Sequence, residues 1–280
     1  MRKQHCACAV TLVLGLFFAS SSAQQAKVTR YVRYALKGTM SYGILEGENI
    51  RPVTGNIFED PEPASTTVRL ADVRLMTPCQ PSKVIAVALN YKSNLGDKAP
   101  AAHPELFAKL TSSLVGPEDL ILLPTDSTNA HYGGALVIVV GRRAKNISPA
   151  EAPRYIFGVT AGNDLSERGW EQSDLQWFRA RSSDTFGPVG PVIAQGLNYD
   201  DLLVQTRVNG EVRQSERTRN LVFNTSAIVS YVSKYVTLQP GDLIFTGTPG
   251  ETKAIKSGDV IEVEVEGVGV LRNKAVRVHQ

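Results

Sequence analysis

The sequence predicts an α+β protein that is mostly β, with rolled, mixed β-sheets. Three observations carry this prediction: many short apolar runs of strand length, few segments with helical periodicity, and glycine or proline between them. The 280 residues are 42% hydrophobic and 20% charged, which is typical of a globular protein with a substantial core and excludes a disordered chain. The formal net charge of +3 is too small to indicate a nucleic-acid partner.

The amino end has the pattern of a secretory signal peptide. Arg2 and Lys3 precede an apolar run from Cys6 to Ala19, and small residues follow as far as Ala23. The run is shorter than the roughly 20 apolar residues of a transmembrane helix, although an uncleaved anchor is the alternative. We therefore expect cleavage of residues 1–23 and a periplasmic or secreted protein with no membrane span. Removal leaves 28 bases against 27 acids, a net charge of +1.

Cleavage would also remove two of the three cysteines, Cys6 and Cys8. The remaining Cys79 has no cysteine with which to form an internal disulfide, and one cysteine does not indicate a zinc site. We therefore expect the mature fold to depend on its hydrophobic core.

Residues 24–75 are predicted to form a small β-rich cap. Val28–Leu36 and Tyr42–Leu45 have the composition of strands, and Glu59–Thr67 is a polar connector that contains proline. The main body is predicted to span residues 76–280.

Within this body, continuous apolar runs predict buried strands and one segment has clear helical spacing. The predicted strands are Val84–Leu89, Leu136–Val140, Leu243–Thr246 and Val260–Val265. Ala227–Tyr235 is the predicted helix. Pro149–Tyr155 is expected to form a helical turn, because Ser148 and Glu151 have the spacing of a capping box.

Six segments of the body carry a resemblance to a known family. They are Val87–Tyr91 (VALNY), Pro104–Lys109 (PELFAK), Gly162–Arg168 (GNDLSER), Ser183–Pro191 (SDTFGPVGP), Val208–Glu211 (VNGE) and Pro240–Gly250 (PGDLIFTGTPG). In order and spacing, residues 76–275 resemble the fumarylacetoacetate hydrolase family, which includes acylpyruvate hydrolases and 2-hydroxyhepta-2,4-diene-1,7-dioate isomerases. The resemblance implies the rolled sheets of that family's C-terminal domain, a homodimer, and hydrolysis, decarboxylation or isomerisation of 2-oxo acids.

The resemblance also implies Mg²⁺ or Mn²⁺ held by three carboxylates, two from a Glu-x-Glu strand and one from an aspartate. Asp164 stands at the aspartate position, but Gly133 and Ala135 stand at the two glutamate positions. Because neither supplies a metal ligand, we expect no tightly bound Mg²⁺ or Mn²⁺. Two alternatives remain open at this point: a softer metal held by His131 and Asp164, or a turn or capping role for Asp164.

The residues that would perform the family's chemistry are also replaced. Asn94 stands where the resemblance places the catalytic histidine, and an amide cannot act as a general base. Asp97 stands at the position of its acidic partner, and Arg181 replaces a lysine. His103 lies nearby, either as a residue that reaches the site or as an ordinary loop residue. Glu171 adds a negative charge near the site or is an exposed helical-turn acid.

Other positions match the family and are predicted to bind substrate: Tyr91, Lys109, Arg168, Gly247 and Thr248. An arginine can bind a carboxylate through two hydrogen bonds. The alternatives are surface charge for Lys109 and turn geometry for residues 246–250.

The sequence therefore predicts an exported family scaffold that has lost metal-dependent C–C hydrolysis and isomerisation but keeps a pocket for a small 2-oxo acid. The first alternative is an active Mg²⁺- or Mn²⁺-dependent hydrolase, isomerase or decarboxylase. The second is a subunit that pairs with an active relative.

Overall fold

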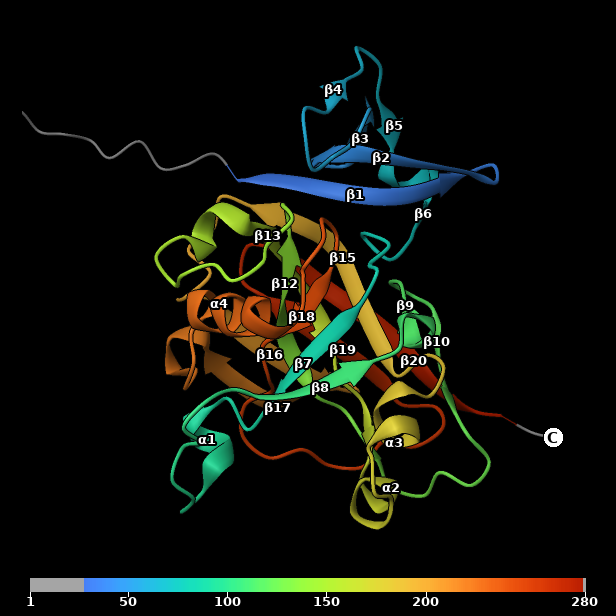
Figure 1. Cartoon of the computed structure of the whole chain (residues 1–280). Coiled ribbons are helices and arrows are strands. Elements are labelled where there is room, and N and C mark those ends of the chain that lie inside the picture. Colours follow the sequence, from blue (N-terminus) through green and yellow to red (C-terminus); the bar gives the residue numbers. More distant parts are fainter. Residues whose placement is uncertain (1–27, 279–280) are drawn as a thin grey trace, which may run out of the picture.

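The computed structural model describes residues 28–278 as two large β-sheets, a two-stranded ladder and four α-helices (Figure 1). Parallel and antiparallel strand pairs occur in both large sheets, which confirms the predicted mostly β, mixed-sheet class. The predicted signal peptide, residues 1–23, lies outside the described residues. Within residues 28–278, no helix is long and apolar enough to cross a membrane.

The N-terminal part lies above one end of the body (Figure 1). Its strands are β1 (Thr29–Leu36), β2 (Thr39–Glu46), β3 (Asn49–Thr54), β4 (Glu62–Pro63), β5 (Val68–Arg69) and β6 (Arg74–Leu75). The β1–β2 hairpin turns at Lys37 and Gly38, which both have positive φ angles, as a two-residue hairpin with the twist of its strands requires. β1 also pairs with β15 (Gly187–Gln195) of the body, so these strands continue the main sheet.

The body supplies the remaining elements. Its strands are β7 (Val84–Ala88), β8 (Glu105–Lys109), β9 (Leu114–Val115), β10 (Leu120–Leu123), β11 (Ala130–His131), β12 (Gly134–Val140), β13 (Ile156–Asn163), β14 (Ser166–Glu167), β16 (Leu203–Val208), β17 (Glu211–Arg217), β18 (Leu243–Phe245), β19 (Val260–Val265) and β20 (Gly269–Arg277). Its helices are α1 (Lys92–Leu95), α2 (Arg168–Ser173), α3 (Phe178–Ser182) and α4 (Thr225–Tyr235).

The main sheet has the strand order β4-β3-β2-β1-β15-β13-β12-β18-β7-β8. The short strands β5, β6 and β9 pair with β3, β1 and β15 outside this order. The second sheet has the order β10-β20-β19-β16-β17, and β11 pairs with β14. Since β7 pairs with β18, the segments carrying the Asn-Tyr and Thr-Gly-Thr-Pro motifs begin at the same end of the sheet.

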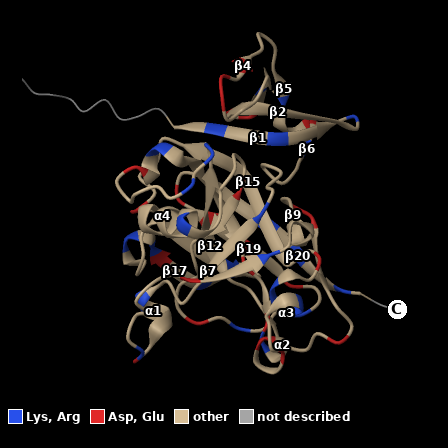
Figure 2. Ribbon diagram, viewed as in Figure 1, with Lys and Arg blue, Asp and Glu red and all other residues tan. Residues whose placement is uncertain are grey.

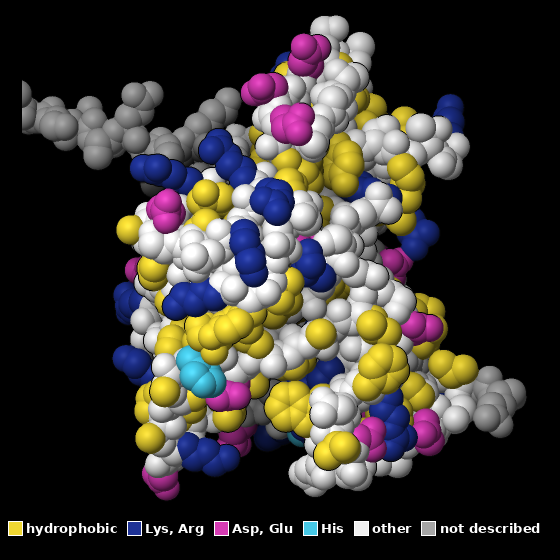
Figure 3. Space-filling view, viewed as in Figure 1, with side chains coloured by type: hydrophobic (Ala, Val, Ile, Leu, Met, Phe, Trp, Pro, Cys, Tyr) yellow, Lys and Arg dark blue, Asp and Glu magenta, His cyan; other side chains and the backbone are white. Residues whose placement is uncertain are grey.

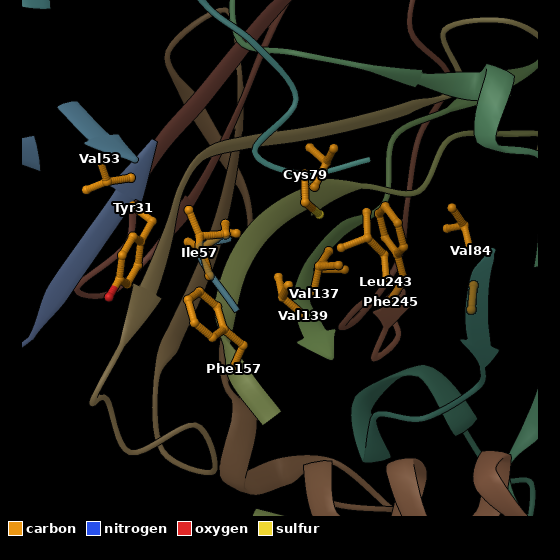
Figure 4. Close-up of a cluster of buried hydrophobic side chains, with 14 residues drawn as sticks. Tyr31, Val53, Ile57, Cys79, Val84, Val137, Val139, Phe157, Leu243 and Phe245 are labelled. Atoms are coloured by element: carbon orange, nitrogen blue, oxygen red, sulfur yellow. The ribbon is translucent and has the colours of Figure 1, made fainter. Parts of the chain in front are cut away.

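β12 shows why a continuous apolar run predicts a strand of this kind. All seven of its residues are buried. Val137 and Val139 pack in a cluster with Phe157 and Phe245 (Figure 4), whereas Ile138 and Val140 pack in another with residues of α4. A strand covered on both faces needs an apolar residue at every position.

The helical predictions hold with shifted ends. α4 begins two residues before the predicted Ala227 because the Asn224 side chain accepts a hydrogen bond from Ala227 N at 2.9 Å and caps the helix. The predicted turn at Pro149 is a 3₁₀ turn over Ala152–Tyr155. It starts later than predicted, although Glu151 Oε2 accepts a hydrogen bond from Ser148 N at 2.9 Å.

Candidate functional site

A cavity of about 440 Å³ is lined by residues of α1, α2 and α3, of strands β7 and β8, and of neighbouring loops. Five predicted site residues line it: Asn94, Asp164, Arg168, Arg181 and Thr248. Its other lining residues are Val87, Ala88, Leu89, Leu95, Lys98, Ala99, Ala101, His103, Glu105, Phe107, Glu171, Trp177 and Phe223. Acidic and basic residues lie close together around α2 and α3 (Figure 2).

Asp164 follows the end of β13 and is 8% exposed. Its Oδ2 accepts a hydrogen bond from Arg181 Nη1 at 2.9 Å, and its Oδ1 lies 2.9 Å from Lys109 Nζ. Lys109 also donates to the backbone oxygen of Arg181. Burial lowers the pKa of Lys109, and the neighbouring Asp164 carboxylate opposes this shift. Both oxygens of Asp164 are therefore paired with cations from two other elements, β8 and α3.

Glu171 joins the same network from α2. Its Oε1 accepts a hydrogen bond from Arg181 Nη2 at 2.9 Å, and its Oε2 accepts from Arg168 Nη1 at 2.7 Å and Ser166 Oγ at 2.6 Å. Burial would raise the pKa of this carboxyl, but Arg181, Ser166 and Arg168 together lower it below its ordinary value. The interpretation of Glu171 as an exposed helical-turn acid is wrong, because its side chain is only 13% exposed.

Arg181 is held on its faces as well as at its ends. Its guanidinium carbon lies 4.5 Å from the centre of the Phe107 ring and 5.7 Å from that of Trp177, within cation–π range. The Nε atom of Arg181 is buried and has no hydrogen-bond acceptor among residues 28–278.

The family's other metal-ligand positions do not fit a divalent ion. A Cβ atom at Gly133 would lie 2.6 Å from the backbone oxygen of Asp164, so no side chain fits there unless the backbone moves. Ala135 is fully buried in the apolar cluster around Val137. Within the described part of the chain, no three His, Cys, Asp or Glu residues are grouped to hold a metal ion. The residues present supply one carboxylate, already paired, where three ligands are needed.

Of the predicted residues in the segment around α1, Asn94 lines the cavity, whereas Asp97 and Tyr91 do not. Asn94 Nδ2 donates to the backbone oxygen of Gly250 at 2.6 Å, which ties α1 to the loop after β18. Asp97 is exposed and is not among the lining residues of the cavity. Tyr91 is fully buried, does not line the cavity, and its hydroxyl has no partner in residues 28–278; burial raises its pKa.

The loop after β18 contains two further predicted residues. Thr248 Oγ1 accepts a hydrogen bond from Gln214 Nε2 at 2.9 Å, which leaves its own hydroxyl hydrogen available to a ligand. Gly247 has a φ angle of 107°, and a Cβ there would lie 3.0 Å from Cβ of Asn90. This close approach explains the glycine by turn geometry.

The two histidines near the site have defined surroundings. His131 Nδ1 lies 2.9 Å from Thr252 Oγ1, and Nε2 lies 3.0 Å from Asn129 Oδ1, so both ring nitrogens have partners other than Asp164. Burial, and then Arg168, lower the pKa of His131. His103 lines the cavity, and its ring stacks on Tyr231 with 5.6 Å between centroids.

Sequence reasoning did not identify two important side chains of this site, Phe107 and Trp177, which form an aromatic wall. It placed the negative charge of Glu171 near the site, but not as the bridge between the two arginines. The spacing supplies one signal for this contact, because Glu171 lies three residues after Arg168 on a helix. Nothing in the sequence spacing indicates that Trp177 faces Arg181.

Comparison with known proteins identifies the family. Residues 83–276 match the model described as fumarylacetoacetate (FAA) hydrolase, C-terminal. The chain belongs to the fumarylacetoacetate hydrolase family. Residues 29–78 match a second model, described as Rv2993c-like, N-terminal.

Relatives within the family cover nearly the whole chain. Protein Rv2993c of Mycobacterium tuberculosis is 39% identical over 260 residues, which is 89% of this chain and 98% of that protein. A crystal structure of 2-hydroxyhepta-2,4-diene-1,7-dioate isomerase from Mycobacterium marinum has 39% identity and a TM-score of 0.85, covering 90% of this chain and 100% of that one.

A third relative shows metal and ligand binding within the family. Maleylpyruvate hydrolase from Sphingobium sp. SYK-6, in complex with a manganese(II) ion and pyruvate, has 27% identity and a TM-score of 0.76, and covers 89% of this chain and 100% of that one. This chain therefore has the fold of the family, and its relatives include isomerases and hydrolases.

Proposed function

We propose that this protein is a fumarylacetoacetate hydrolase-family scaffold that has lost metal-dependent C–C hydrolysis and isomerisation and keeps a pocket for a small 2-oxo acid. The single observation behind this proposal is the pairing of Asp164 with Arg181 and Lys109. A carboxylate held by two cations is a poor ligand for a third, because the incoming ion must displace them.

The loss of a general base supports the same proposal. The amide of Asn94 does not titrate near neutral pH and so cannot act as a general base, and general acid–base catalysis contributes about 10²–10⁴-fold to rate. A Lewis-acid metal contributes several kcal/mol more. Arg168 and the Thr248 hydroxyl remain in the cavity as donors for a carboxylate or a keto oxygen.

We also propose that the protein is an exported homodimer, periplasmic or secreted. The pattern of residues 1–23 supports export. Support for the dimer comes from the surface at β8, which is the last strand of the main sheet. Apolar side chains gather over β8, α2 and α3 (Figure 3), and Leu175 and Phe178 are 96% and 65% exposed.

The test is the metal content of the purified protein, followed by calorimetric titration with Mg²⁺ and Mn²⁺ and by assays of acylpyruvate cleavage with each ion. We expect no stoichiometric metal, no saturable heat and no metal-dependent turnover. Robust Mn²⁺-dependent cleavage would overturn the proposal.

Restoration of the family residues provides a second test. Gly133→Glu, Ala135→Glu and Asn94→His return the carboxylates and the imidazole, but they leave Arg181 paired with Asp164. Because the backbone at Gly133 must move to accept a side chain, the variant is first shown to fold by circular dichroism. We expect weak metal binding to appear only when Arg181→Lys is added. Tight Mn²⁺ binding by the chain without Arg181→Lys would show that the guanidinium does not compete with the ion.

An active Mg²⁺- or Mn²⁺-dependent hydrolase, isomerase or decarboxylase is the second candidate. One observation favours it: His103 and Glu105 both line the cavity, with His103 Nδ1 3.9 Å from Glu105 Oε1. A histidine beside a carboxylate is a suitable general base. This candidate requires a measurable activity that both Asp164→Ala and His103→Ala abolish, and an unchanged rate in either variant excludes it.

A further inference from the structure

The charged side chains at one end of the cavity can be summed to a net charge. Lys109, Arg168 and Arg181 contribute three positive charges, and Asp164 and Glu171 contribute two negative charges, all connected by ion pairs. The network therefore carries one uncompensated positive charge. Lys98 and Glu105 also line the cavity, and because their charges are opposite they leave this balance unchanged. One carboxylate would neutralise it, whereas a dianion would bring a second charge without a partner into a partly buried site.

The same end of the cavity offers donors to a ligand. The guanidinium of Arg168 lines the cavity and is only partly buried. The Thr248 hydroxyl supplies a second donor, because its oxygen already accepts from Gln214. Arg181 is 7% exposed, and its terminal nitrogens already donate to Asp164 and Glu171, so it contributes charge to the site.

Apolar side chains form much of the remaining wall, namely Val87, Leu89, Leu95, Phe107, Trp177 and Phe223. Asn94, Lys98, His103 and Glu105 also line the cavity. Phe107 and Trp177 stand edge to face, with 5.6 Å between their centroids. The cavity volume of about 440 Å³ lies within the roughly 300–1,000 Å³ of small-molecule sites.

From these three observations we infer that the cavity binds a carboxylic acid with a single negative charge and an apolar or aromatic body, without a metal ion. Arg168 and Thr248 receive the carboxylate, and the Phe107–Trp177 wall receives the body. This inference rests on the proposed function and narrows the ligand of the same site. The fixed guanidinium of Arg181 supplies the positive charge.

The test compares three 2-oxo acids by calorimetry in EDTA: phenylglyoxylate, which is an aromatic monoanion, pyruvate, which is a small monoanion, and 2-oxoglutarate, which is a dianion. We expect phenylglyoxylate to bind at least about tenfold more tightly than either of the others. Added Mn²⁺ should leave its affinity unchanged.

The two tryptophans of the chain provide matched variants. Trp177→Ala removes part of the wall and should weaken phenylglyoxylate about tenfold while changing pyruvate little. Trp170→Ala is the control, because Trp170 does not line the cavity and contacts Arg179 instead. Trp177→Phe keeps an aromatic ring and should retain most of the affinity, which separates lost contact from lost folding.

The outcomes distinguish this inference from the proposed function. Equal or tighter binding of 2-oxoglutarate in EDTA overturns the inference and leaves the proposed function intact. Failure of all three acids to bind in EDTA, or an unchanged phenylglyoxylate affinity in Trp177→Ala, also overturns the inference. Binding that appears only with Mn²⁺ overturns both.

Discussion

Two buried aspartates lie beside opposite ends of β12 and are held in different ways. Asp242 is fully buried, and its carboxylate accepts hydrogen bonds from the backbone N–H groups of Ser82, Lys83 and Gln239 at 2.7–3.1 Å and from the Lys83 ammonium at 2.6 Å. Asp164, at the other end, is paired with the side chains of Arg181 and Lys109. A carboxylate bound mainly by backbone donors fixes a turn, whereas one bound by charged side chains of other elements is part of a network that a ligand can enter.

The largest expected effect is at the end of the network. Asp164→Asn leaves Lys109 and Arg181 buried without their carboxylate, and breaking a buried ion pair costs about 3–5 kcal/mol. We expect the free energy of unfolding in urea to fall by about 3 kcal/mol or more. Adding Arg181→Met should recover much of the lost stability, because one of the two cations left without a carboxylate is then absent. A single variant as stable as the parent would show that the pairing contributes nothing.

A somewhat smaller effect is expected at the opposite end. Asp242→Asn keeps one acceptor oxygen but turns an NH₂ group toward Gln239 N and the Lys83 ammonium, which both bond to Oδ2. We expect a loss of about 2 kcal/mol in urea denaturation. Unlike the previous case, a second substitution, Lys83→Met, should not recover the loss, since the backbone N–H of Gln239 still has no acceptor. Recovery in the double variant would make the two ends alike.

The difference between the two ends also explains how far the sequence could predict each. The strands Val84–Ala88 and Gly134–Val140 follow from apolar runs, because both faces are covered. The turn at Asp242 follows from the Pro-Gly-Asp string next to it. In both cases the residues that decide the structure are close in sequence.

The site depends on residues that are distant in sequence. The sequence identifies Arg181 and Asp164 as an altered and a retained family position, but their mutual bond depends on where α3 packs against β8 and β14. Similarly, Lys109 comes from β8, and its contact with Asp164 joins residues 55 apart in number. Side-chain networks across elements are set by tertiary packing, which spacing along one chain does not reveal.

The smallest predicted effect is on how stability depends on pH at Glu171, which belongs to the same network as Asp164. The pKa of Glu171 is lowered in the folded state, chiefly because Arg181, Ser166 and Arg168 outweigh the opposing effect of burial. Its stabilising contribution is therefore complete above the ordinary value of 4.5 and is lost as the pH falls through the lowered one. We expect Glu171→Gln to lose about 1 kcal/mol at pH 7 and to show a flatter fall in stability below pH 4.5 than the parent. Parallel pH profiles would contradict this.

Cys79 lies at the Asp242 end, where its thiol donates to the backbone oxygen of Gly241 at 3.3 Å. Burial, and then the charge of Asp242, raise its pKa from 9.0 to about 12. At a given pH the reactive thiolate is then far scarcer than in an exposed cysteine. Since Cys79 is the one cysteine beyond residues 1–23, a thiol-reactive dye would label a chain without those residues almost only after this end opens. The rate at which the Cys79 thiol becomes reactive therefore reports how fast this end of the protein unfolds.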